Sequence, residues 1–155
     1  MIRRAVPSDA RGIAIVHVQG WREAYAHLVP AEALARLSVP QRELRWHELI
    51  AGATVIHVAT DRDRIVGFAG SSVGQVGAPT DLELESLYVL ASHYGSGVGK
   101  LLLDAAIVDH PAWLWVAEDN PRARAFYARN GFTADGAVET HSLAGTPVRA
   151  IRMTR

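Results

Sequence analysis

Apolar residues in the first third of the chain recur every three or four positions, the spacing of one face of an amphipathic helix. This pattern predicts a first helix that begins at Pro7-Ser8-Asp9, with Ser8 as its N-cap, and continues toward Pro30. Its apolar face comprises Ile13, Val16, Gly20, Trp21, Ala24 and Leu28. The same reasoning predicts a short strand over residues 3–6 and further helices over 31–37 and 40–50.

From residue 54 onward the pattern changes to that of strands. Residues 54–60 are rich in β-branched side chains and a polar turn follows, so residues 54–72 are predicted to form a hairpin. A strand over 81–90, a helix over 97–109 and a strand over 113–117 imply a crossover between two parallel strands. The other expected elements are a loop over 74–80, a helix over 121–130 and closing strands over 132–140 and 147–153.

The predicted fold class is therefore α/β. We expect a mixed, mostly antiparallel sheet with a central parallel strand pair, joined by a β-α-β crossover and flanked by helices. The chain has 155 residues, which suits one domain over residues 1–155.

The strand over residues 81–90 changes its pattern halfway. Leu82 and Leu84 share one face and Glu83 and Glu85 the other, whereas the later apolar residues have the opposite parity. A one-residue slip at Glu85-Ser86, as in a β-bulge, reconciles the two halves and leaves backbone amides unpaired. The competing interpretation is a central strand buried on both faces, where parity carries little information.

Composition and charge exclude several classes of protein. The 16 basic and 16 acidic residues give a formal net charge of zero, which argues against a partner such as nucleic acid or an anionic membrane. Without cysteine there is no disulfide or thiolate-bound zinc, and the seven histidines have no metal-ligand spacing. These two observations predict a protein without a bound metal. No segment resembles a signal peptide or a membrane span, so we expect a cytoplasmic location.

A glycine-rich segment, Tyr94-Gly95-Ser96-Gly97-Val98-Gly99-Lys100, connects the strand to the next helix. Glycines allow a tight turn and close approach to a ligand, and a helix N-terminus presents free N–H groups, so the segment suits a pyrophosphate. It is not a P-loop, because Leu101 follows Lys100 where Ser or Thr is required, and it lacks the third glycine of a dinucleotide fingerprint. A purely structural turn is the alternative.

A second motif opens the last predicted helix. Asn120 suits the N-cap, Pro121 suits the first helical position, and Gly131 suits the end. Phe126 and Tyr127 point about 100° apart on a helix, so one can join the core while the other faces a cleft. The competing interpretation is that Tyr127 is an ordinary core residue.

Together, the strand ending in Leu87-Tyr88-Val89, the glycine segment followed by Leu101-Leu102, and the stretch from Asn120 to Phe132 resemble the GNAT superfamily of N-acetyltransferases. Members carry Q/R-x-x-G-x-G/A at the pyrophosphate turn, and Tyr94 stands here where Arg or Gln is usual. The resemblance covers residues 81–132 closely and implies acetyl-CoA as co-substrate. The cofactor-binding residues that it implies are Leu87, Tyr88, Val89, Tyr94, Gly95, Ser96, Gly97, Val98, Gly99, Lys100, Asn120, Ala123, Phe126 and Tyr127.

The resemblance also implies a mechanism, in which an amine attacks the thioester directly in a ternary complex and Tyr127 approaches the sulfur. A thiol has a pKa of about 8.5 and tyrosine about 10, so complete proton transfer from Tyr127 is uphill by about 2 kcal/mol and a hydrogen bond is favoured. The amine must also lose a proton. Glu85, and after it Glu83, are the candidate general bases, unless both are merely solvated residues of one strand face.

Recognition of the acceptor is less clearly encoded. Trp21 and Tyr25 lie one turn apart on the first helix and are candidates to stack on the acceptor, although core packing is equally typical of aromatics. The expected acceptor is a primary amine of a small molecule or a peptide, and similar proteins often form homodimers. Further candidates, for the adenosine phosphate of the cofactor, are Arg122, Arg124 and Arg129.

Two other functions are alternatives to acetyl transfer. The first is a non-catalytic module of the same fold that binds or senses acyl-CoA. The second is a serine esterase, because Gly70-Ser71-Ser72-Val73-Gly74 matches G-x-S-x-G. That motif must lie between a strand and a helix, and the residues after Gly74 do not suit a helix.

Overall fold

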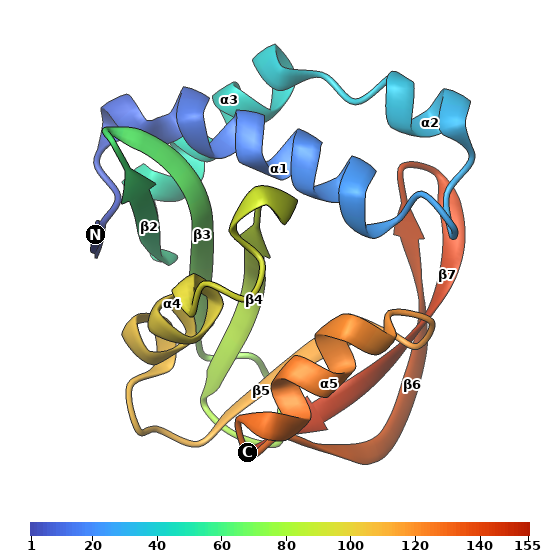
Figure 1. Cartoon of the computed structure of the whole chain (residues 1–155). Helices are drawn as coiled ribbons and strands as arrows, with labels where there is room; N and C mark the ends of the chain where they lie inside the picture. The colour runs from blue at the N-terminus through green and yellow to red at the C-terminus, as the bar shows by residue number, and fades with distance from the viewer.

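A seven-stranded sheet with the order β1-β2-β3-β4-β5-β7-β6 forms the centre of the computed structural model, which describes residues 1–155 (Figure 1). Strands β4 and β5 are parallel, and every other neighbouring pair is antiparallel. The predicted fold class is thereby confirmed. The strands are β1 (Ile2–Arg4), β2 (Val55–Asp61), β3 (Arg64–Val73), β4 (Leu82–Val89), β5 (Ala112–Ala117), β6 (Thr133–Leu143) and β7 (Thr146–Thr154).

Helices cover both faces of the sheet. Helices α1 (Ala10–Ala24) and α3 (Val39–Ala51) pack together over one face, while α4 (Val98–Ile107) and α5 (Pro121–Arg129) lie on the other (Figure 1). A short helix α2 (Ala31–Ala35) and two 3₁₀ turns, Pro7–Asp9 and Ala91–His93, complete the chain. No helix combines the length and the apolar character that a membrane span requires.

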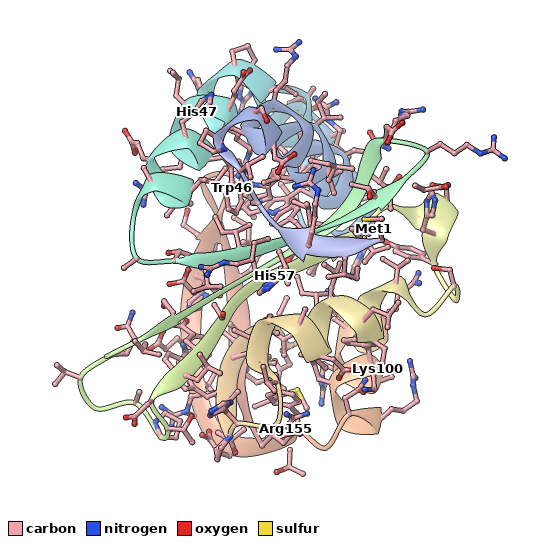
Figure 2. The ribbon with its side chains drawn as sticks, turned by 90° about the vertical axis from the view of Figure 1, so that its left-hand side faces the viewer. Met1, Trp46, His47, His57, Lys100 and Arg155 are labelled. Carbon is pink, nitrogen blue, oxygen red and sulfur yellow. The ribbon has the colours of Figure 1, made fainter.

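The alternation of side chains along β3 creates two apolar layers. Phe68 packs with Trp46 in the layer beneath α1 and α3, whereas Ala69 belongs to the layer that contains Leu102 of α4. Figure 2 shows Trp46 on the inner side of α3 and His47 on its outer side, which agrees with their burial and exposure. The sheet is thus a central layer between two helical layers.

The parallel pair separates soon after it begins. Residue pairing between β4 and β5 is limited to Leu82 with Ala112 and Glu83 with Trp113, and beyond these the strands diverge. The ladder between β3 and β4 shifts register between Gly70 and Ser71, which leaves Glu85 without a partner on β3. The predicted bulge is therefore present, and it bends β4 at the point where the two strands part.

Two local expectations were wrong. Ser8 is not the N-cap of a helix, because it lies inside the 3₁₀ turn Pro7–Asp9, which follows Val6, and α1 follows Asp9. The carboxylate of Asp9 accepts the N–H of Val6 at 2.8 Å and pairs with Arg3 at 2.7 Å. The first helix also ends at Ala24, well before Pro30. Long-range packing decides this end, since Val29 leaves the helix path and joins an apolar cluster with residues of β5 and β7.

Candidate active site

The diverging strands open into a cleft with a volume of about 1200 Å³. Residues of α1 and α3 line one side, the glycine segment and α5 line the other, and the β6–β7 hairpin lines one end. The residues that the sequence predicted for catalysis, cofactor binding and acceptor binding all line this cleft, except Ser96 and Val98. Of the three arginines considered for the adenosine phosphate, Arg122 and Arg129 line the cleft and Arg124 does not. The structure therefore gathers site candidates from four separate parts of the chain.

The glycine turn has a backbone that favours glycine at two positions. Gly95 and Gly97 have φ angles of +74° and +87°, and Gly97 is the residue that caps α4. A Cβ at either position would meet no protein atom within 4 Å, so backbone conformation rather than crowding requires these glycines. Gly99 has a packing role instead, because a Cβ there would lie 3.4 Å from the ring of Phe126 on α5.

Four N–H groups of this turn have no acceptor within the protein: those of Gly95, Gly97, Gly99 and Lys100. They lie at the N-terminus of α4, where the helix dipole also favours negative charge. The ammonium group of Lys100 is bonded to the carboxylate of Asp104 at 2.5–2.6 Å, so only its amide is available at the turn. This arrangement of free donors suits an anion such as a diphosphate.

Arg122 brings a positive charge to the glycine turn. Its guanidinium lies over the ring of Tyr94, 3.0 Å from the ring centroid. Tyr94 occupies the position where the GNAT pattern has Arg or Gln, and the stacked Arg122 restores a cation there from α5. Arg124 instead donates to the carbonyl oxygen of Glu118, away from the turn.

Strand β4 directs free backbone groups into the cleft. Leu90 donates its N–H to Val66 on β3, and amide directions alternate along a strand. The amides of Leu87 and Val89 therefore point to the other side, where β5 has diverged. An extended ligand arm can hydrogen bond to these groups in the way that a neighbouring strand would.

The ring of Tyr127 packs in the core, and the residue also lines the cleft. Asn120 is the N-cap of the helix that carries Tyr127, as predicted, and its side chain accepts the N–H of Ala123 at 3.2 Å. The ring is buried and lies edge-to-face with Phe126 and Phe132. Burial, and then the nearby Tyr25, raise the pKa of Tyr127, so its hydroxyl is a proton donor throughout the physiological range.

The opposite wall is aromatic. Trp21 and Tyr25 meet edge-to-face with centroids 5.4 Å apart, and the hydroxyl groups of Tyr25 and Tyr88 are 3.1 Å apart. Gly20 allows this contact, because a Cβ there would lie 3.3 Å from the ring of Tyr88. The side chain of Tyr88 therefore lies beside the acceptor candidates of α1, and not beside the glycine turn.

His17 and Arg42 extend this wall, and the sequence did not single them out. The indole N–H of Trp46 donates to Nδ1 of His17 at 3.2 Å, and Nη1 of Arg42 lies 3.1 and 3.2 Å from the two ring nitrogens. Burial, and then the charge of Arg42, lower the pKa of His17 to about 3. The spacing of His17 four residues before Trp21 was a usable signal, whereas nothing in the local sequence of Arg42 indicates its position.

Acidification is expected to destabilise the fold through His17. An unfolded histidine takes up a proton below pH 6.5, and folded His17 resists it down to about pH 3, so stability falls as the pH drops through this window. At pH 5 the loss amounts to about 2 kcal/mol. Urea unfolding at pH 7 and pH 5 measures it, and His17→Asn should remove this part of the pH dependence.

The exposed His47 of α3 provides the matched control for that experiment. His47→Asn should keep the full difference between pH 7 and pH 5. An unchanged pH dependence in His17→Asn would show that other groups cause the acid sensitivity.

The two candidate bases lie in different surroundings. Glu83 is half-buried where β4 and β5 separate, and burial, followed by the charge of Glu85, raises its pKa. Glu85 is exposed on the bulge, and its carboxylate accepts a hydrogen bond from Ser72 at 2.6 Å.

The G-x-S-x-G stretch does not form the nucleophile turn of a serine esterase. Its central Ser72 lies inside β3, and no helix follows that strand directly, so the required strand–helix elbow is absent.

Two parallel strands separate around the cleft, and a glycine turn and free backbone amides lie beside it. This is the architecture of an acyl-CoA N-acyltransferase. Comparison with known proteins agrees with this class. Residues 21–132 match the acetyltransferase (GNAT) family, and the chain belongs to this family.

Relatives and solved structures extend the likeness beyond the matched segment. A probable N-acetyltransferase of Mycobacterium tuberculosis is 28% identical over 143 residues, which are 87% of this chain and 80% of the relative. A GCN5-related N-acetyltransferase from Rhodopseudomonas palustris has 25% identity and a TM-score of 0.75 over 100% of this chain and 94% of its own. The PaiA N-acetyltransferase of Thermoplasma acidophilum, solved in complex with coenzyme A, has 18% identity and a TM-score of 0.73 over 97% of this chain and 96% of its own.

Proposed function

We propose that this protein transfers the acetyl group of acetyl-CoA to a primary amine in a ternary complex. The observation that carries the proposal is the group of four free amides at the start of α4, beside strands that diverge enough to admit an extended thioester arm. A fold neighbour was solved with coenzyme A, which supports the same ligand class here.

The cofactor arrangement follows from the donors along the cleft. The diphosphate binds the amides of Gly95, Gly97, Gly99 and Lys100. The pantetheine arm runs along β4, where the Leu87 and Val89 amides bind it and polarise the thioester carbonyl. Ser96 and Val98 contribute only by shaping the turn. The remaining cofactor contacts proposed on the α5 side involve Tyr94, Asn120, Ala123 and Phe126.

The chemical step forms one bond and breaks one bond. The neutral amine nitrogen attacks the thioester carbon, the C–N bond forms, and the C–S bond breaks to release coenzyme A as a thiolate. Tyr127 donates a hydrogen bond to that sulfur, and its raised pKa makes donation more favourable than complete proton transfer. The proton of the amine passes to a carboxylate, directly or through water.

Glu83 is the better-suited base of the two glutamates. Its raised pKa increases its proton affinity, while the carboxylate of Glu85 is already engaged by Ser72. A base must be ionised, so activity is lost as the pH falls through the pKa of Glu83, and a raised pKa moves this loss toward neutral pH.

Substitution distinguishes the two carboxylates. Glu83→Gln is expected to lower kcat about 10-fold and to remove that low-pH decline, measured by a pH–rate profile. Glu85→Gln is expected to have the smaller effect. The reverse order would assign the proton to Glu85, and two unaffected profiles would leave water as the base.

Calorimetry and thiol release together test the proposed function. Titration with acetyl-CoA should give binding, and a panel of primary amines should yield free thiol above the rate of uncatalysed hydrolysis. Binding without amine-dependent thiol release would instead favour a non-catalytic acyl-CoA module. An absence of any binding would overturn the proposal.

A further inference from the structure

Arg42 lines the cleft as a cation without an acidic partner. The other arginine of α3, Arg45, pairs with Glu48 at 3.0 Å, and Arg11 of α1 pairs with Glu43 at 3.1 Å. Arg42 forms no such pair, although it is half-buried among aromatic side chains. A half-buried guanidinium is costly without a counter-charge, so an unpaired guanidinium in the cleft points to an anionic ligand.

The guanidinium of Arg42 has protein contacts at Nη1, whereas its Nε and Nη2 edge is free. Its carbon lies 4.6 Å from the ring centroid of Trp21, and Nη1 lies against the imidazole of His17. The other two nitrogens, Nε and Nη2, make no hydrogen bond within the protein. An arginine fixed in this way presents a planar pair of donors that matches both oxygens of a carboxylate.

Arg42 lies on the same wall as the groups around the reaction. The ring of His17, which contacts Arg42, has its centroid 5.4 Å from that of Tyr88, and the hydroxyl of Tyr88 lies 3.1 Å from that of Tyr25. Residues from α3, α1 and β4 thus form one connected polar group, and Tyr127 of α5 lines the same cleft. A small molecule in this cleft can place one end at Arg42 and the other beside the thioester.

We infer that the acceptor is an amino acid or a similar small amine with a carboxylate, and that Arg42 binds the carboxylate. The inference rests on the proposed acetyl transfer and specifies its acceptor. Arg42 holds the anionic end, Glu83 and Glu85 line the same cleft and favour the ammonium end before its deprotonation, and Trp21 and Tyr25 provide apolar surface for the side chain. Arg42 is thus a specificity-determining residue.

The competing role for Arg42 is purely structural, as a support for Trp21 and His17. That role predicts a loss of stability on substitution without a change in the preference among acceptors. The two roles therefore differ in the ratio of kcat/KM between acceptors that differ only in the carboxylate.

The first test uses the unmodified protein with two probe pairs, leucine with leucinamide and phenylalanine with phenylalaninamide. After correction for the fraction of unprotonated amine, kcat/KM should be about 100-fold higher for the acid of at least one pair. Equal or higher values for both amides would overturn the inference. So would acetylation of neutral amines with no activity toward any of the twenty L-amino acids.

The second test changes Arg42. In Arg42→Gln the preference for the acid should fall to within about 3-fold, while the Kd for acetyl-CoA stays within about 2-fold. Arg42→Lys keeps the charge but loses the planar donors, so it should retain part of the preference. Arg36→Gln, at the exposed end of α2, removes the same charge away from the cleft and should keep the full preference.

These measurements distinguish a failure of the inferred acceptor from a failure of the proposed function. Loss of acetyl-CoA binding in the parent protein counts against the proposed function. Intact binding and turnover with an unchanged acid preference in Arg42→Gln count only against the role of Arg42. Thermal unfolding of each variant shows whether a loss of activity comes from a loss of fold.

Discussion

Replacing Tyr127 by phenylalanine is expected to lower kcat about 100-fold while the Kd for acetyl-CoA stays within about 2-fold. The hydroxyl is removed but the ring keeps its edge-to-face contacts with Phe126 and Phe132. A hydrogen bond to a charged group contributes about 1.5–3 kcal/mol, and a developing thiolate in a buried site is such a group. A loss of about 2.7 kcal/mol corresponds to 100-fold in rate.

Single-turnover release of thiol measures this effect at the chemical step, and calorimetry measures the affinity. Because the ring stays packed, the free energy of unfolding should change by less than about 1 kcal/mol. A wild-type rate in Tyr127→Phe would remove the hydroxyl from the mechanism. An equal rise in Kd would mean that Tyr127 binds the cofactor in the ground state instead of assisting departure of the thiolate.

Replacing Gly97 by alanine is expected to raise the Kd for acetyl-CoA about 100-fold. At a φ of +87°, alanine costs roughly 1–2 kcal/mol of backbone strain, and its methyl group enters space at the turn that no protein atom occupies. In the proposed complex, the diphosphate lies beside this position. Loss of one or two charge-assisted hydrogen bonds from the diphosphate accounts for the weaker binding. The protein itself places no atom near this Cβ, so the effect on folding is limited to the strain.

Gly136 offers a matched control for this substitution. Its φ is +92°, a Cβ there also meets no atom within 4 Å, and it lies on β6. Gly136→Ala should lose the same roughly 1–2 kcal/mol in urea unfolding, yet bind acetyl-CoA as the parent does. If the two variants bind alike, the amides at the start of α4 are not the diphosphate site.

The glycine turn and the α5 motif were readable from the sequence because their chemistry is local. A left-handed glycine before a helix, an Asn N-cap and a proline at the first helical position act within a few residues. The bulge at Glu85 was also readable, since a change in side-chain parity is a direct consequence of an inserted residue. The strand–helix–strand unit then predicted the parallel pair.

The errors and omissions have a common physical origin in contacts between distant segments. Ser8 was a reasonable N-cap by residue type, but the ion pair of Asp9 with Arg3 gave the backbone a different partner. The first helix was expected to continue toward Pro30, but packing of Val29 against β5 and β7 ends it earlier. Propensity is a weak preference that tertiary contacts of a few kcal/mol override.

The sequence by itself determined the class of fold, the glycine turn and the helix that carries Tyr127, because each depends on backbone conformation set by neighbouring residues. Only the tertiary structure decided which side chains share the cleft. It placed Arg122 on Tyr94, brought Arg42 from α3 to Trp21 and His17, and separated the surroundings of Glu83 and Glu85. These contacts join residues far apart in the chain. Their burial and charge set the proton affinities of the cleft and underlie the proposed acceptor preference, which no local pattern records.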